Sequence, residues 1–306
     1  MNFWLSQLTL VGVYIVLVCS YDLIAGRAGL LSLAHAALFG VGAYTTSLVM
    51  IHTGFTDIIG LIPIGALAAA LLSLPIAALS LRVRKEYFAV TSMGFAFAFV
   101  AVLQNLPFFG QSEGLIGIPT MTLGPLKFTS VVGVTVLALC VAAAVVVATV
   151  WLVRSRWGLN LAAVRDSENG AVSFGINPVA MRTWAVVISG AGAGIAGALY
   201  VVYAKFVSPD TFDLPTLALV VAMLGFGQTL GSIGYVAGPA VLVGVSGALQ
   251  YLHVVSLTVL GPVDQIIYGL VMVFAIMAVP REFRIPSRRS SPPLAAGVVP
   301  PKRTQA

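Results

Sequence analysis

The stretch RWGLNLAAVRDSENGAVSFGINPVAMRTWAVVISGAGAGIAGALY, from Arg156 to Tyr200, places a polar segment directly before a long apolar run. The apolar run, residues 183–204, is long enough for a transmembrane helix, which needs about 20 residues. Only helices and closed barrels satisfy the backbone in lipid, and the alternating pattern of barrel strands is absent from this sequence. The stretch therefore predicts an all-α membrane protein with a polar connection at one membrane surface.

The composition indicates an integral membrane protein throughout. The chain has 306 residues, of which 59% are hydrophobic and 8% charged, and its mean hydropathy is +1.03. Soluble domains carry about 25% charged residues. We expect a polytopic helical bundle of about nine spans, with a range of roughly eight to ten. The expected spans are residues 5–24, 28–50, 58–81, 87–109, 129–153, 183–204, 214–230, 236–253 and 262–279.

The basic residues predict the orientation of these spans. If the N-terminus lies outside, Lys127 and Lys205 alone among the 16 Lys and Arg residues fall outside the cytoplasm. Cytoplasmic loops carry an excess of Lys and Arg, so this orientation, with a cytoplasmic C-terminus, fits best. The formal net charge of +6 then reflects topology, and we expect no nucleic-acid partner. The sequence predicts a membrane domain over 1–285 and a disordered cytoplasmic tail over 286–306.

The polar connection at 154–182 has the pattern of a short amphipathic helix lying on the membrane surface. Its apolar residues can share one face: Leu161, Val164, Ala171 and Val172. Its polar residues lie mostly on the other face: Arg165, Asp166, Glu168 and Asn169. Gly175 can end this helix in the left-handed conformation, and Asn177 followed by Pro178 can begin the next helix. We therefore predict that helix 158–174 is a rigidly mounted contact for a partner.

Two glycine-rich zones indicate either tight helix packing or the lining of a solute path. In the first, AGLLSLAHAALFGVGAYTT (28–46), Ser32 and His35 add polarity that a spanning helix does not need. His35 can be a hydrogen-bonded structural residue or part of the path, and both roles stay open. The second zone, GFGQTLGSIGYVAGPAVLVGVSG (225–247), partly repeats the glycine spacing of the first, which suggests an internal repeat. The path candidates are Ser32, His35, Gly40, Gln228 and Gly238.

Several chemistries are absent from the sequence. It has no G-x-x-x-x-G-K-[ST] phosphate loop and no His or Cys pair with metal-ligand spacing, and both cysteines, Cys19 and Cys140, fall within expected spans. The spans also lack the series of acids and histidines expected of a proton-coupled pump. The chain is therefore predicted to be a non-catalytic protein that binds no cofactor or metal. Any uphill transport must draw its energy from another subunit.

Four segments of the chain resemble the permease subunits of branched-chain amino-acid ABC transporters, the LivH/LivM family, and most closely the LivM type. They are AGLLSLAHAALFGVGAY, GLIGIP at 114–119, GLNLAAVRDSENGAVSFGIN at 158–177 and SGAGAGIAGALYVVYAKFVSPDTF at 189–212. The resemblance implies that 158–174 is a coupling helix seated in a groove of an ATPase. The coupling residues that it implies are Leu161, Arg165, Asp166, Glu168, Asn169, Gly175 and Asn177.

The resemblance also implies partners and a location. The chain would be a multi-pass protein of the bacterial inner membrane, in contact with lipid and paired with a second, LivH-like permease. Two cytoplasmic ATPase subunits would bind ATP and Mg²⁺, and an extracytoplasmic solute-binding protein would dock on outer loops that include 110–128. Branched-chain amino acids are the substrates that the family implies, with urea, short amides or small aromatic acids as alternatives.

Two other classes of function are alternatives to an ABC permease. A stand-alone secondary transporter or channel would work without an ATPase and would need an embedded ion site, for which the sequence offers few polar groups. A membrane-embedded enzyme, such as a lipid transferase, would need clustered acids or histidines near one interface, and the sequence shows no such cluster.

Overall fold

The computed structural model of the chain describes residues 2–83, 85–123, 126–127, 130–228, 231–251, 266 and 269–270. The expected span at 262–279 and the tail at 286–306 lie outside the described residues, apart from isolated positions. The α-helices are α1 (Asn2–Tyr21), α2 (His35–Thr53), α3 (Ile58–Arg82), α4 (Lys85–Asn105), α5 (Val131–Arg154), α6 (Arg156–Asp166), α7 (Glu168–Ser173), α8 (Pro178–Ala204), α9 (Leu214–Gln228) and α10 (Gly234–Tyr251).

Short elements connect these helices. A π-helix, η1 (Asp22–Arg27), follows α1, and 3₁₀ turns are η2 (Pro107–Phe109), η3 (Gln111–Glu113), η4 (Pro209–Phe212) and η5 (Gly231–Ile233). Two strands of two residues each, β1 (Thr122–Leu123) and β2 (Leu126–Lys127), pair in antiparallel fashion.

The expectation of a polytopic helical membrane protein is confirmed. Within the described part of the chain, 7 segments are long and apolar enough to cross a membrane. They are Phe3–Arg27, His35–Thr53, Ile58–Arg82, Tyr87–Asn105, Val131–Arg154, Pro178–Ala204 and Pro209–Gln228. The expected span at 236–253 corresponds to α10, whose apolar part, Gly234–Ala248, is shorter. The internal repeat stays a prediction.

The expected start of the second span at residue 28 is wrong. The first helix continues past Tyr21 as η1, and α2 begins only at His35. Gly29 between them has a φ of +68°, a left-handed conformation that cannot continue a right-handed helix. The backbone N–H of Leu33 is satisfied instead by the Ser92 hydroxyl of α4, at 2.9 Å. An apolar sequence therefore crosses this region without forming a helix.

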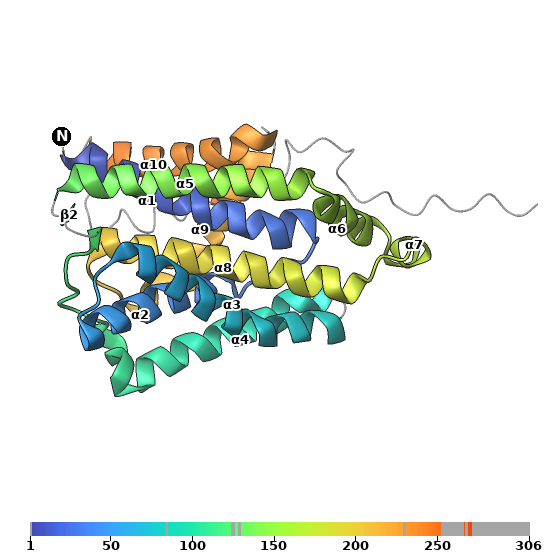
Figure 1. Ribbon diagram of the computed structural model, residues 1–306, viewed down its shortest axis with the longest axis horizontal. Coiled ribbons are helices and arrows are strands. Elements are labelled where there is room, and N and C mark those ends of the chain that lie inside the picture. Colours follow the sequence, from blue (N-terminus) through green and yellow to red (C-terminus); the bar gives the residue numbers. More distant parts are fainter. Residues whose placement is uncertain are drawn as a thin grey trace, which may run out of the picture.

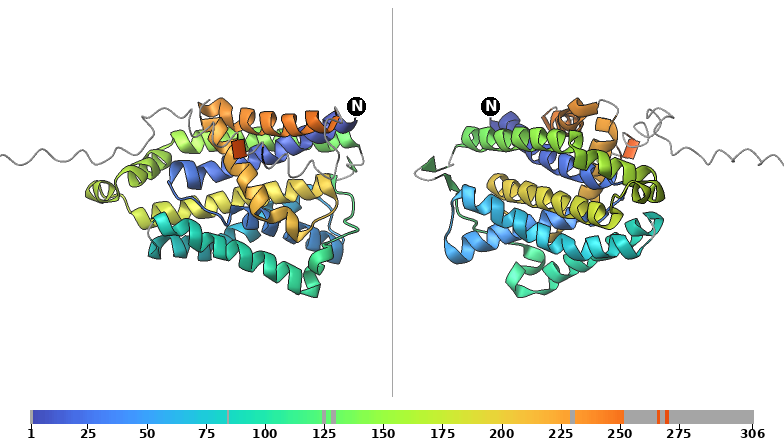
Figure 2. Two further views of the ribbon diagram at one scale, coloured as in Figure 1. Left: turned by 180° about the vertical axis from the view of Figure 1, so that it is seen from behind. Right: turned by 45° about the vertical axis from the view of Figure 1, so that its right-hand side comes forward.

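Helix α8 lies at the centre of the bundle (Figure 1), with α1, α5 and α10 on one side and α2, α3 and α4 on the other. It packs against α1, α2, α3 and α5. Figure 2 shows α9 crossing the bundle obliquely, and α9 packs against both α1 and α10.

Glycines allow α8 to approach its neighbours closely. A Cβ atom on Gly194 would lie 2.4 Å from the Gly65 carbonyl oxygen of α3, and a Cβ atom on Gly42 of α2 would lie 2.4 Å from the Gly194 carbonyl oxygen. Real Cβ atoms do not approach other atoms so closely, so only glycine fits at these positions. The small-residue pattern of α8 is thus explained as a packing contact.

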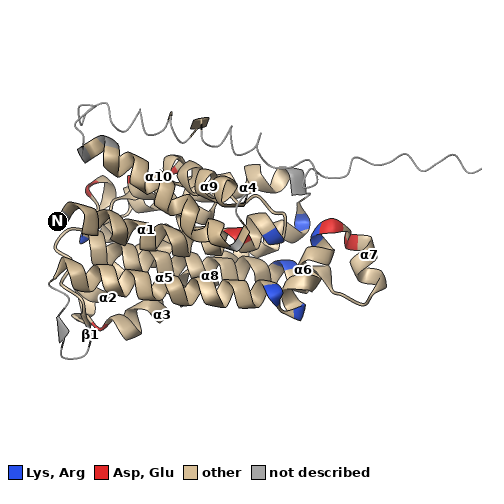
Figure 3. Cartoon of the chain, turned by 90° about the horizontal axis from the view of Figure 1, so that it is seen from above, with Lys and Arg blue, Asp and Glu red and all other residues tan. Residues whose placement is uncertain are grey.

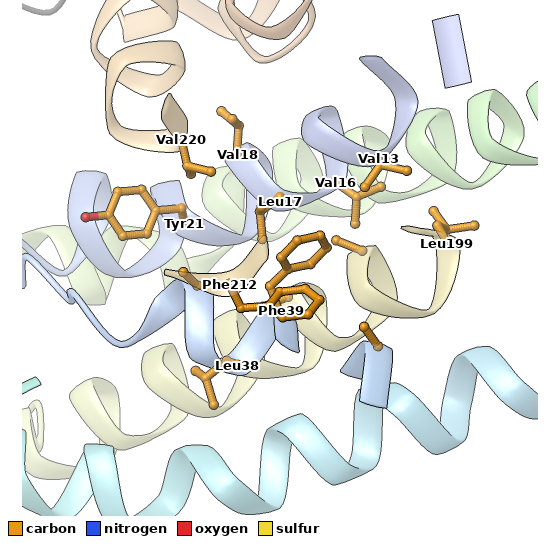
Figure 4. Packing of buried hydrophobic residues seen from close by; sticks show 14 of the residues in the cluster. Val13, Val16, Leu17, Val18, Tyr21, Leu38, Phe39, Leu199, Phe212 and Val220 are labelled. Atoms are coloured by element: carbon orange, nitrogen blue, oxygen red, sulfur yellow. The ribbon is translucent and has the colours of Figure 1, made fainter. Parts of the chain in front are cut away.

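Aromatic side chains fill the core beside α8 (Figure 4). Phe212 of η4 is fully buried, and its ring centroid lies 5.1 Å from that of Phe39 on α2, in an edge-to-face arrangement. Tyr200 of α8 packs on both rings, at 5.6 Å from Phe39 and 6.2 Å from Phe212. The short turn before α9 is therefore anchored inside the bundle.

The loops at the end of the bundle opposite α6 and α7 are joined by backbone hydrogen bonds. Leu115 and Val207 exchange bonds of 2.8 and 3.2 Å, and the Thr122 N–H donates to the Thr56 carbonyl at 2.8 Å. The described part of the 110–128 loop is therefore tied to the loops that precede α3 and follow α8. Ile116 is exposed on it.

We expect Gly194→Ala to destabilise the bundle by about 1–3 kcal/mol or more, because the added methyl group overlaps the α3 backbone. Thermal unfolding of the purified protein in detergent measures the effect. Gly94→Ala in α4 is the matched control, since nothing lies within 4 Å of its Cβ position. Equal melting temperatures for the two variants would contradict the packing argument.

Candidate functional site

The segment from Ser155 to Asn177, here called the elbow, projects from one end of the bundle (Figure 1). The expected single helix over 158–174 is wrong, because the segment forms two helices, α6 and α7, with a break at Ser167. Ser167 is extended, with φ −152° and ψ 108°, and its hydroxyl accepts a hydrogen bond from the Gly170 N–H at 3.1 Å. A serine in this conformation is a favourable N-cap, so it ends α6 and begins α7.

The C-terminal end of the elbow has the predicted caps. Gly175 has a φ of +76° and follows α7. The Asn177 side-chain oxygen accepts hydrogen bonds from the N–H groups of Val179 at 3.0 Å and Ala180 at 3.2 Å, and Pro178 is the first residue of α8. The roles predicted for Gly175 and Asn177 as caps are confirmed. The elbow is therefore joined to α8 through a junction with few free backbone angles.

Three of the four residues predicted to form the inner apolar face are buried: Leu161, Val164 and Ala171. Val172 is not among them, since its exposed fraction is 56%, and Phe174 is 87% exposed. The break at Ser167 rotates α7 relative to a continuous helix, which explains why the face predicted from one helical period fails after residue 171. Val172 and Phe174 form an apolar patch at the tip of the elbow, here called the tip patch.

Two charged residues of the elbow bond within the chain. Arg165 on α6 donates from Nη1 to the Gly26 carbonyl oxygen of η1. Glu168 forms an ion pair with Arg182 of α8, with 2.6 Å between Oε2 and Nη2. The Arg182 side chain is 10% exposed and that of Glu168 is 47% exposed. Asp166 and Asn169, in contrast, are exposed.

A second charged cluster lies where α1 ends. The Asp22 carboxylate, with 4% of its side chain exposed, accepts hydrogen bonds at Oδ2 from the Tyr235 hydroxyl at 2.6 Å and from Arg27 Nε at 3.0 Å. Arg27 also donates to the Tyr235 oxygen, at 3.3 Å. A buried carboxylate is costly unless it is paired and hydrogen-bonded, and here both conditions hold. Asp22 and Tyr235 are 213 residues apart, so sequence reasoning missed this cluster, although an acid at the edge of an apolar span was a signal for it.

Arginines gather at the elbow end of the bundle, as the blue segments near α6 show (Figure 3). The arginines on the elements that meet there are Arg27, Arg82, Arg154, Arg156, Arg165 and Arg182. At the opposite end, Lys205 follows α8, and the acids Asp57, Glu113, Asp210 and Asp213 lie in the connecting loops. Among the described residues, basic side chains are in excess at the elbow end, although Asp22, Asp166 and Glu168 also lie there, and acids are in excess at the opposite end even with Lys127 included.

The path candidates are spread over α2 and the segment before it, α9 and α10. Ser32 and His35 are buried at the start of α2, where His35 Nε2 lies 3.0 Å from the Ser20 hydroxyl. Since that hydroxyl donates to the Leu17 carbonyl at 2.7 Å, His35 Nε2 is the donor toward Ser20. This bond gives His35 a structural partner.

The glycine candidates are packing positions. A Cβ atom on Gly40 would meet the Phe212 and Phe99 rings within 3 Å, and one on Gly238 would lie 2.3 Å from the Met223 carbonyl oxygen. Gln228 is exposed at the end of α9. The structure does not bring these five residues into one cluster. Among the residues that it describes, no group of three or more His, Cys, Asp or Glu could hold a metal ion.

We expect Glu168→Ala to lower the unfolding free energy by about 1–3 kcal/mol, because it leaves the largely buried Arg182 guanidinium without its carboxylate partner. Asp166→Ala is the matched control, since it removes an exposed acid of the same segment and should change stability by less than about 0.5 kcal/mol. Denaturant unfolding of both variants measures the difference. A cost for Asp166→Ala as large as that for Glu168→Ala would show that the ion pair does not hold the elbow.

The comparisons with known proteins agree with this architecture. Residues 3–276 match the family described as "Branched-chain amino acid transport system / permease component". The chain is 30% identical over 271 residues to the high-affinity branched-chain amino acid transport system permease protein LivM of Salmonella typhimurium, and 29% identical over 269 residues to the protein of the same name from Escherichia coli.

Each alignment covers 79% of this chain, and the chain spans 62% of the length of each relative. No solved structure is significantly similar to it. The match along nearly all of the chain, together with its apolar spans, shows that this protein belongs to the family of permease components of branched-chain amino acid transport systems.

Proposed function

We propose that this chain is the membrane-spanning permease subunit of an ATP-driven ABC importer that moves branched-chain amino acids across the bacterial inner membrane. Its family and the names of its relatives support this class of protein and substrate. The chain itself does no chemistry and binds no cofactor in this proposal. ATP and Mg²⁺ are bound by two partner ATPase subunits.

The charge difference between the two ends of the bundle supports an orientation. The elbow end carries the arginines, and cytoplasmic segments of membrane proteins are enriched in Arg and Lys. The elbow therefore lies in the cytoplasm. This orientation puts the N-terminus, at the opposite end of α1, outside the cell and the C-terminus in the cytoplasm.

The tip patch is the observation that carries the proposal. Phe174 is 87% exposed at the far end of a segment that projects beyond the spanning helices. An apolar patch at a polar surface marks a contact with another protein. Asp166 and Asn169 lie exposed on the same segment and supply polar groups around it. We therefore assign the tip patch to a groove of the ATPase subunit.

Movement of the elbow reaches the bundle through α8. The elbow continues into α8 at Asn177 and Pro178, and Glu168 is paired with Arg182 one turn further on. Helix α8 is the central helix and packs against α2 and α3 without intervening side chains at Gly194. A displacement of the elbow is thus passed to helices on both sides of α8, and the pathway changes between inward-facing and outward-facing states.

The solute-binding protein and the second permease contact other surfaces of the bundle in this proposal. The extracytoplasmic solute-binding protein docks on the end opposite the elbow, where the 110–128 loop presents Ile116. A second, LivH-like permease completes the pathway beside this chain. Ser32, His35, Gly40, Gln228 and Gly238 remain the candidates for its lining. Gly40 is covered by Phe212 and Phe99, so a path along α2 is closed there in this conformation.

We expect Phe174→Ser to weaken copurification of the chain with its ATPase by roughly tenfold or more, because a large apolar contact is lost from the centre of the interface. Ile116→Ser is the matched control, since it removes an exposed apolar residue at the opposite end. Copurification of Ile116→Ser should equal that of the unaltered protein. Undiminished ATPase binding by Phe174→Ser would refute the assignment of the tip patch.

Reconstitution tests the substrate. Vesicles that contain the complete complex should take up leucine, isoleucine or valine only when ATP and the solute-binding protein are present. Uptake by the chain alone would support a stand-alone transporter or channel instead. Uptake of urea, short amides or small aromatic acids, without branched-chain amino acids, would overturn the substrate assignment while leaving the ABC mechanism in place.

A further inference from the structure

Arg165 connects the elbow to the segment between α1 and α2. Its guanidinium donates to the Gly26 carbonyl oxygen, and its side chain continues over Gly29, where a Cβ atom would lie 3.0 Å from Arg165 Cγ. The left-handed φ of Gly29, +68°, favours glycine as well. The arginine side chain therefore contacts the backbone at Gly26 and Gly29 with no other side chain between them. A movement of α6 is expected to move this backbone.

The segment under Arg165 is wound in an unusual way. Residues Asp22–Arg27 form a π-helix, and the N–H of Ala28 bonds the Leu23 carbonyl at 3.1 Å. Single π-turns within helices are rare and are often found at functional sites. Beyond this turn the chain runs without helical structure until α2 begins at His35. The two spanning helices are thus joined through backbone that is not regular α-helix.

The Asp22 side chain packs against the backbone of the same segment. A Cβ atom on Gly26 would lie 1.9 Å from Asp22 Oδ1, so the carboxylate occupies the space directly above the Gly26 backbone. The other oxygen, Oδ2, holds the Tyr235 hydroxyl of α10 at 2.6 Å. Arg165, Gly26, Asp22 and Tyr235 therefore form a continuous series of contacts from α6 to α10. This series does not pass through α8.

We propose that this series is a second route by which the elbow acts on the bundle, with Arg165, Asp22 and Tyr235 as positioning residues that keep ATP hydrolysis coupled to transport. The inference rests on the proposed function, because it requires an ATPase on the elbow. A purely structural anchor for α10 would need only Asp22 and Arg27 beside Tyr235. The additional bond from Arg165 connects that anchor to the surface on which the ATPase acts.

The test uses the complete complex in vesicles, with the ratio of ATP hydrolysed to amino acid taken up as its readout. Tyr235→Phe removes the hydroxyl that bonds Asp22 and keeps the ring. Arg165→Gln removes the charge over Gly26, and because Arg165 is exposed, this variant tests the route even if Tyr235→Phe fails to fold. Tyr44→Phe is the matched control, since it removes another buried tyrosine hydroxyl, one that has no hydrogen-bond partner in the structure.

We expect Tyr235→Phe and Arg165→Gln each to raise the ratio of ATP used to solute moved by roughly tenfold, the factor that one hydrogen bond to a charged group is worth. Both variants should still assemble with the ATPase. In the double variant, this ratio should rise by no more than about the larger of the two single-variant increases, because both changes interrupt one route. Tyr44→Phe should keep the ratio of the unaltered protein.

A ratio unchanged in Tyr235→Phe and Arg165→Gln would overturn the inference, as would effects that multiply fully in the double variant. Failure of the unaltered chain to assemble with any ATPase would instead refute the proposed function. The two failures are therefore distinguishable.

Discussion

Backbone contact between α8 and its neighbours is the constraint on which the rest of the structure depends. Helices in lipid gain little from burying apolar side chains against one another, so their association depends on close packing and interhelical bonds. At Gly194, Gly65 and Gly42, three helices approach so closely that a methyl group would not fit. Because α8 also begins at the elbow, these contacts hold within the bundle the helix to which the elbow is joined.

Buried charge is concentrated at the elbow end of the bundle. Asp22 and Arg182 are the charged residues among those described as buried, and both lie at the elbow end. Each has a more exposed partner, Arg27 for Asp22 and Glu168 for Arg182, and removing the partner leaves the buried charge uncompensated. At the opposite end, backbone bonds between loops and the Phe212 ring do the equivalent work without charge. The elbow end is therefore held by interactions that are strong but depend on exact geometry.

Much of this fold could be predicted from local sequence. The lengths of the apolar runs predicted most of the spans. The roles of Gly175 and Asn177 could be predicted because helix caps depend on residues only a few positions apart. The errors arise where a simple pattern does not record a local change in the backbone. Hydropathy does not distinguish helix from unwound chain when both are apolar, so the late start of α2 at His35 was missed, and a single helical period does not register the cap at Ser167. The Asp22–Tyr235 bond joins residues that only the folded chain brings together.

The elbow departs only in part from the usual arrangement of a surface helix, in which charges face water and apolar residues face the protein. Arg165 and Glu168 turn toward the chain and fix the elbow to η1 and α8, while Val172 and Phe174 face outward. The two bonds fix the orientation of the elbow on the bundle. A contact mounted on a flexible loop would absorb the movement of a partner, whereas directional bonds to two separate helices pass it on. Of the charged residues that the sequence predicts for the partner interface, Arg165 and Glu168 also bond within the chain, whereas Asp166 is exposed, and their part in coupling stays a prediction.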